Sequence, residues 1–153
     1  MKNYLINILD FYDEQLNHII GISDFDLKIN TDSLKDYHKQ KVRQEETTLG
    51  NLVTDAYRYL GNSNISMVRD GTIRDDLTKG NITLKTIYNI LPYSSNIIVK
   101  EITGQDILDA LELGMSSLPQ RAAKFLQVSG MSFNVDVNIK SLLELKEKEE
   151  LVM

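Results

Sequence analysis

The sequence predicts an α+β domain in which helices pack on a layered, mixed sheet. Two patterns alternate along its 153 residues: apolar residues at helical spacing, and short apolar runs between turn residues. Capping residues and glycines separate the segments, which gives the order helix, strand, helix, strand, short helix, strand, helix and strands. This length suits one domain with a sizeable core.

A helix is predicted from about residue 2 to residue 20. Apolar residues recur there every three or four positions, and Gly21 follows where a helix end is expected. We interpret residues 1–22 as a linker-like helix, residues 23–137 as the domain proper, and residues 138–153 as a divergent tail that leans helical.

The next segments are a short strand and a polar stretch. Phe25, Leu27 and Ile29 alternate with polar residues, which predicts a strand. Residues 31–46 are rich in charge and contain almost no large apolar residue. We therefore expect this stretch to be a surface excursion.

A second helix is predicted over residues 48–60, with Gly61 at its C-terminal cap. We expect it to bury Leu49, Leu52, Val53, Ala56 and Leu60. The apolar run at residues 65–68 predicts a buried strand, because turn residues bound it on both sides.

Two capped helices and two strands follow. Thr83 can cap a short helix over residues 84–90, which Pro92 ends. Residues 96–102 are predicted as a strand. Thr103 and Asp106 resemble a capping box and open a helix that carries Ile107, Leu108 and Leu111. Residues 125–137 alternate in hydrophobicity around Gly130, which predicts a bent strand or a hairpin.

Composition and charge exclude several function classes. With 17 basic and 22 acidic residues the net charge is −5, which argues against a nucleic-acid partner. The sequence has no cysteine, so disulfide scaffolds, thiolate metal sites and cysteine nucleophiles are excluded. Charges interrupt the apolar N-terminal stretch, so we expect no membrane segment and no signal peptide, and a cytoplasmic location by default.

No catalytic constellation stands out. His18 is expected to be solvated on its helix, and Asp36-Tyr-His38 lies in the polar stretch without a rigid strand to hold metal ligands. The motifs of nucleophilic triads and phosphate-binding loops are missing from the sequence. We therefore expect no catalytic residue, no metal ligand and no cofactor in this chain.

The loop at residues 69–74 is a candidate anion site. Gly71 would allow a tight turn with exposed N–H groups, and Arg69 and Arg74 flank it with bidentate donors. Taken alone, these residues fit a plain turn with two surface arginines equally well. Tyr93, at the end of a helix, is either a stacking platform or an amphipathic residue at the core boundary.

Five segments, in this order, resemble the C-terminal domain of 5′-nucleotidases over about residues 43–136. They are Arg43-Gln-Glu-Glu-Thr-Thr-Leu-Gly-Asn-Leu-Val-Thr-Asp-Ala56, Arg69-Asp-Gly-Thr-Ile-Arg74, Gly80-Asn-Ile-Thr83 with Leu91-Pro-Tyr93, Ile102-Thr-Gly104 with Leu111-Glu-Leu-Gly114, and Lys124-Phe-Leu-Gln-Val-Ser-Gly130. The resemblance implies a layered α+β domain that binds the nucleoside end of a nucleotide.

By this resemblance, Arg43 and Arg74 would contact the sugar and phosphate, and Tyr93 would replace a phenylalanine that stacks on the base. Arg69 stands where the family has a base-contacting asparagine. Asp70 replaces a glycine of the family loop, which places a negative charge where an anion would approach.

In this family a separate metallophosphatase domain with a divalent metal pair hydrolyses the phosphate. The sequence contains no segment like it, and it ends before the family's last aromatic motif. We therefore expect the nucleoside-binding portion of a 5′-nucleotidase-like hydrolase of nucleotide catabolism, not catalytic by itself. A truncated remnant or scaffold without a ligand is the alternative.

Expected partners are a weakly bound nucleoside or nucleotide, and either a separate metallophosphatase chain or a second copy at an open sheet edge. Full-length family members are often exported.

Overall fold

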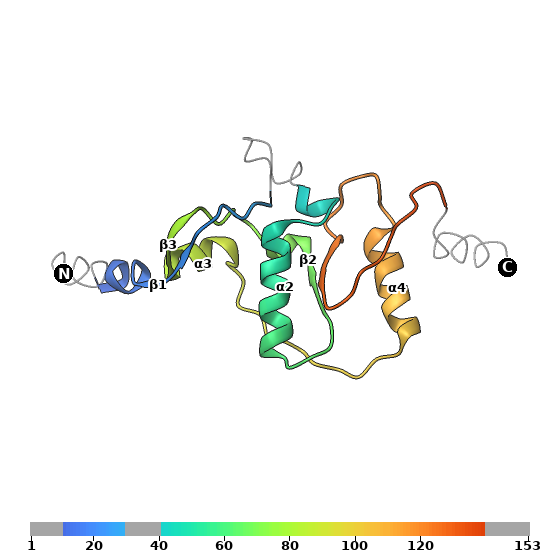
Figure 1. Ribbon diagram of the computed structural model, residues 1–153, viewed down its shortest axis with the longest axis horizontal. Helices are drawn as coiled ribbons and strands as arrows, with labels where there is room; N and C mark the ends of the chain where they lie inside the picture. The colour runs from blue at the N-terminus through green and yellow to red at the C-terminus, as the bar shows by residue number, and fades with distance from the viewer. Residues whose placement is uncertain (1–10, 30–40, 140–153) are drawn as a thin grey trace, which may run out of the picture.

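The structure is a computed structural model that describes residues 11–29 and 41–139 (Figure 1). Its elements confirm the predicted α+β class. In chain order they are strand β1 (Ile19–Ser23), 3-10 helix η2 (Lys41–Arg43), helix α2 (Thr48–Leu60), strand β2 (Ser66–Arg69), 3-10 helix η3 (Asp70–Thr72), strand β3 (Gly80–Thr83), helices α3 (Leu84–Ile90) and α4 (Gly104–Met115), and strand β4 (Leu126–Ser129).

The named strands of the described residues form two antiparallel pairs. In the first pair, β1 runs against β3, and Ser23 lies opposite Gly80. In the second pair, β2 runs against β4, with Ser66 opposite Ser129 and Arg69 opposite Leu126. Helix α2 packs on the second pair, and α4 contacts it through β4. Figure 1 shows the second pair between these two helices.

One hydrophobic core joins the elements on the α2 side. It comprises Ile29, Val42, Leu49, Val53, Val68, Ile73, Leu77 and Ile90. Val42 and Ile73 are completely buried, and they directly precede the predicted site residues Arg43 and Arg74. The core therefore fixes η2 and the loop at residues 69–74 relative to each other.

The predicted bounds of α2 and α3 are confirmed, and so are their caps. Thr47 caps α2 by accepting a hydrogen bond from the Gly50 N–H, and Gly61 closes its C-terminus. Capping boxes open α3 at Thr83 and α4 at Thr103. These short-range patterns depend on neighbouring residues alone, which is why the sequence predicts them well.

The expected burial of α2 is only partly right. Leu49 and Val53 are buried, whereas Leu52, Ala56 and Leu60 are exposed. A two-stranded ribbon is narrow, so it covers a thin stripe of the helix and leaves the neighbouring apolar residues in solvent.

The first helix ends earlier in the structure than the sequence predicts. Residues 11–16 are helical, but Ile19–Ser23 form β1, so Gly21 lies within a strand and ends no helix. The β-branched residues Ile19, Ile20 and Ile22 favour the extended conformation, and β3 supplies the partner strand. Residues 1–10 lie outside the described part.

The strand expected at residues 25–29 is reduced to a single bridge between Leu27 and Leu77. The expected surface excursion is wrong for its last part, since Val42 and Arg43 are buried; residues 31–40 are outside the description. An arginine that looks like a surface residue in the sequence is buried here because a carboxylate compensates its charge.

Two further expected strands differ from the structure. Residues 96–102 form no strand, and Ile98 is 79% exposed. Of residues 125–137, only β4 is a strand, and the chain turns away at Gly130, whose φ is +79°. The apolar pattern therefore indicated residues that suit a strand. For residues 96–102 and for the residues after Gly130, however, the described part of the chain supplies no partner strand. The helical tendency of the tail concerns residues 140–153, which are not described.

Candidate functional site

The loop at residues 69–74 is fixed at both ends by backbone hydrogen bonds. The Asp70 N–H donates to the carbonyl of Phe125 at 2.9 Å, and the Arg74 N–H donates to the carbonyl of Ile90 at 2.8 Å. Between them, Ile73 is fully buried. The loop is therefore held in place by the residue that precedes β4, by the end of α3 and by the core.

Arg43 and Asp70 form a buried ion pair beneath this loop. The Arg43 Nε lies 3.6 Å from Asp70 Oδ2, and the two side chains are 9% and 0% exposed. Neither the Arg43 Nε nor either carboxylate oxygen makes a hydrogen bond. Since the carboxylate is enclosed, the Asp70 charge does not stand at the loop surface, contrary to the position that the sequence suggested.

The pKa of Asp70 is raised above its ordinary value of 3.8. Burial is the largest cause, because a low-polarity environment penalises the charged carboxylate. Arg43, the Gly71 N–H, Arg69 and Arg74 lower the pKa, in this order, and do not fully offset the burial. The Asp70 carboxylate thus lies in the field of three arginines.

Arg74 and Tyr93 form the solvent-facing part of the site. The Arg74 guanidinium donates a hydrogen bond of 2.7 Å to the Tyr93 hydroxyl. The Arg74 Cζ also lies 5.3 Å from the centre of the tyrosine ring, within the range of a cation–π contact. Tyr93 is 54% exposed, so its ring remains accessible.

The other two predicted site residues differ in importance. Arg69 ends β2 with an exposed side chain on the same loop. Gly71 does not have a positive φ, and a side chain at this position would meet no heavy atom within 4 Å. Here η3 makes the turn with a backbone conformation that residues other than glycine can also adopt.

Gln127 fixes the segment that carries Arg43, a role that the sequence analysis did not identify. Its Oε1 accepts hydrogen bonds from the Thr47 N–H at 3.0 Å and from the Thr47 hydroxyl at 3.3 Å. Its Nε2 donates to the carbonyls of Val42 at 3.1 Å and Glu45 at 2.9 Å. Every hydrogen-bonding group of this buried amide is thus used to attach β4 to residues 42–47.

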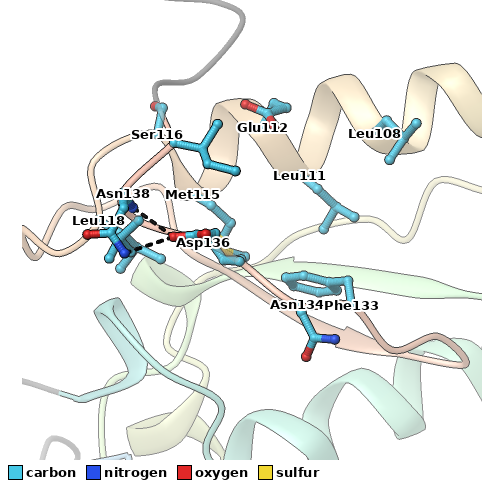
Figure 2. A pocket seen from close by; sticks show the side chains of 13 residues that line it. Leu108, Leu111, Glu112, Met115, Ser116, Leu118, Phe133, Asn134, Asp136 and Asn138 are labelled. Carbon is cyan, nitrogen blue, oxygen red and sulfur yellow. Dashed lines mark hydrogen bonds between the residues drawn. The ribbon is translucent and has the colours of Figure 1, made fainter.

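A separate groove of about 440 Å³, lined by both apolar and polar side chains, lies between α4 and residues 133–139. In Figure 2, Leu111 and Met115 of α4 face Phe133 and the chain beyond it. Asn138 closes one end by donating two hydrogen bonds to Asp136 Oδ1. None of the predicted site residues lines this groove, so the groove is separate from the loop at residues 69–74.

The described residues contain neither a cluster of metal ligands nor a membrane-spanning helix. Over residues 11–29 and 41–139, no three His, Cys, Asp or Glu side chains gather closely enough to hold a metal ion. Within the same ranges, no helix has the length and apolar character needed to cross a membrane.

Residues 22–144 match the family model described as the 5′-nucleotidase C-terminal domain. The chain belongs to this family. The fold of this 5′-nucleotidase C-terminal domain is also similar to that of a solved 5′-nucleotidase. The crystal structure of a 5′-nucleotidase precursor from Thermus thermophilus superimposes with a TM-score of 0.74 and 29% identity, over 92% of this chain and 27% of that one.

The curated relatives of this 5′-nucleotidase C-terminal domain are much longer proteins. The trifunctional nucleotide phosphoesterase protein YfkN of Bacillus subtilis is 32% identical over 123 residues, which is 76% of this chain and 8% of YfkN. Cell wall protein Lmo0130 of Listeria monocytogenes is 33% identical over 77% of this chain and 16% of its own length. A 5′-nucleotidase of Vibrio parahaemolyticus is 25% identical over 62% of this chain and 17% of its own. The chain therefore spans less than a fifth of these relatives.

In this 5′-nucleotidase C-terminal domain, the predicted site residues fall into two groups. Arg43 is internal and paired with Asp70, whereas Arg74, Tyr93 and Arg69 face solvent. The sequence did not indicate the Arg43–Asp70 pair, because the two residues are far apart along the chain. For Gln127 the only signal was a polar residue in the middle of a buried strand.

Proposed function

We propose that this 5′-nucleotidase C-terminal domain binds the nucleoside end of a nucleotide at the Arg74–Tyr93 pair, and that it does not hydrolyse phosphate by itself. The observation that carries the proposal is an accessible tyrosine ring held in place by a guanidinium group. A fixed aromatic ring provides a stacking surface for a base, and an adjacent arginine provides donors for sugar or phosphate oxygens.

The geometry behind the pair supports a binding role. Backbone hydrogen bonds at Asp70 and Arg74 hold the loop, so little conformational entropy would be lost on binding. Arg69 lies on the same loop and adds positive charge to it. The names of the relatives, a nucleotide phosphoesterase and several 5′-nucleotidases, point to nucleotides as the ligand class. Hydrolysis would then need a metallophosphatase domain with its divalent metals, in the same polypeptide or in a separate chain.

Thermal unfolding of the full chain with millimolar adenosine or AMP tests the proposal. A ligand at 100 times its Kd should add about 2.7 kcal/mol of stability and raise the Tm. Tyr93→Ala should weaken binding by roughly fivefold to 150-fold, because base–aromatic stacking contributes about 1–3 kcal/mol. Tyr59→Ala is the matched control, since Tyr59 is 85% exposed on α2 and outside the site. An unchanged Tm with either ligand would contradict the proposal.

The second candidate is an interaction domain without a small-molecule ligand. It is favoured by the exposed apolar residues of two segments that form no strand. These residues are Ile97, Ile98, Val99 and Ile102 in the first segment, and Phe133, Val135, Val137 and Ile139 in the second. Light scattering of the purified chain tests it: concentration-dependent dimers without ligand binding would favour this candidate.

A further inference from the structure

The Arg43–Asp70 pair divides the positive charge around the loop into two parts. The charge of Arg43 is buried and compensated by Asp70 at 3.6 Å. Arg69 and Arg74 lie on the solvent side, and both still act on the Asp70 carboxylate electrostatically. A bound phosphate would therefore meet the positive charge of these arginines together with the negative charge of Asp70.

From this arrangement we infer that Asp70 is a specificity-determining residue, which lowers the preference of the site for nucleoside monophosphates over uncharged nucleosides. The inference rests on the proposed nucleoside-binding function. Asp70 acts as a fixed counterion: a phosphate that approaches Arg69 and Arg74 competes with the carboxylate for the same positive field. An uncharged nucleoside, which is bound by stacking on Tyr93, does not meet this competition.

The hydrogen bonding of the pair supports a role in tuning charge. The Arg43 Nε and both Asp70 oxygens are buried without a hydrogen bond. A buried ion pair contributes to stability only when additional hydrogen bonds satisfy its remaining atoms. The pair is therefore weak evidence for a net gain in stability, although loss of Asp70 would leave the Arg43 charge buried alone. Besides compensating Arg43, Asp70 acts electrostatically on Arg69 and Arg74.

Calorimetric titration of adenosine and AMP into the full chain provides the test. The titration is done at pH 8 and fixed salt, where the AMP phosphate carries its full charge. The wild type should bind AMP no more than about tenfold more tightly than adenosine. Asp70→Asn should tighten AMP binding by about tenfold and leave adenosine binding unchanged. Asp75→Asn is the matched control, because this exposed aspartate directly follows the loop and its removal should not change the ratio.

The outcomes separate this inference from the function on which it rests. A wild type that prefers AMP over adenosine by about a hundredfold or more would overturn the inference, whether or not the variant folds. An unchanged ratio in an Asp70→Asn protein that still melts cooperatively would also overturn it, while adenosine binding would keep the proposed function in place. If neither ligand binds to any of the three proteins, the nucleoside-binding function itself is wrong, and the inference falls with it.

Discussion

Gly50 in α2 lies against the carboxamide of Gln127 in β4 so closely that no side chain fits between them. A Cβ at position 50 would lie 2.6 Å from the Gln127 Cδ and 2.7 Å from the Thr47 hydroxyl oxygen. The same carboxamide binds Thr47 and the carbonyl of Val42. The glycine thus allows α2 to approach β4, and the glutamine then fixes the segment that carries Arg43.

Gly50→Ala should destabilise the domain by about 2–3 kcal/mol, because the added methyl group overlaps a buried, fully hydrogen-bonded side chain. Urea unfolding measures the change. Gly104→Ala is the matched control: a Cβ there meets nothing within 4 Å at the first position of α4. We expect Gly104→Ala to be neutral or to stabilise by about 0.4–1 kcal/mol. Equal effects of the two substitutions would show that the close approach is not limiting.

Gln127→Leu should cost about 3 kcal/mol, since it keeps the volume but leaves the Thr47 N–H and the carbonyls of Val42 and Glu45 without partners. The Tm should fall by roughly 10 °C. Gln120→Leu, at an exposed glutamine, should change stability by about 0.5 kcal/mol or less. Calorimetry of both variants distinguishes the buried network from a general effect of leucine.

Thr103→Ala should destabilise α4 by about 1 kcal/mol through loss of its N-terminal cap. The pKa of Asp106 lies below 3.8, chiefly because the Thr103 hydroxyl and also its N–H donate hydrogen bonds to this carboxylate. A lowered folded-state pKa stabilises the fold above the ordinary value, and this contribution is lost as pH falls through the folded pKa. In Thr103→Ala the Asp106 pKa, followed by NMR, should rise toward 3.8.

Thr83→Ala serves as the control for this pH effect. Thr83 caps α3 with Thr86 as its partner, and no carboxylate takes part. Its substitution should cost a similar free energy of unfolding that does not depend on pH between about 2 and 5. A pH-dependent loss in Thr83→Ala would contradict the assignment.

These local devices are also what the sequence predicts best. The bounds of α2 and α3 and the caps at Thr83 and Thr103 depend on residues a few positions apart. The strand expected at residues 96–102 depends on a neighbouring strand, and the described residues supply none. The spacing of apolar residues along the chain does not show whether a neighbouring strand exists, so it predicted a strand that the structure does not form.

The candidate site, too, has a part that the sequence predicts and a part that depends on distant contacts. Arg74 and Tyr93 could be identified from the sequence, and the structure brings them into contact. The burial of Arg43 could not, because it depends on Asp70 and on the core that closes over both residues. Its position in a polar stretch indicated a surface residue, whereas pairing with a distant carboxylate places it inside.

Asp70→Asn should change how stability depends on pH. Because the folded-state pKa of Asp70 is raised, the folded protein binds more protons than the unfolded chain just above pH 3.8. The contribution of this group to stability is therefore present at low pH and is lost as pH rises through the folded pKa. Relative to Asp70→Asn, the wild type should gain stability as pH falls through the raised folded-state pKa toward 3.8. Urea unfolding at several pH values above 3.8 measures the difference. A wild type that loses stability relative to Asp70→Asn on acidification would contradict the burial argument.

Arg74→Ala separates a ligand-binding arginine from a structural one. The backbone hydrogen bond from the Arg74 N–H to Ile90 survives the substitution, and the guanidinium contact with Tyr93 lies at an exposed ring. We therefore expect a change in the free energy of unfolding of about 1 kcal/mol or less. The affinity for AMP should fall by roughly 10-fold to 150-fold, because a hydrogen bond to a charged group contributes about 1.5–3 kcal/mol. Arg74→Lys should recover part of the affinity, since it keeps the charge but not the planar, bidentate donor.

Thermal unfolding and calorimetric titration of the same samples give both the free energy of unfolding and the affinity for AMP. A large drop in Tm with unchanged AMP binding would make Arg74 a structural residue that holds Tyr93, and would leave the stacking surface without its charged neighbour.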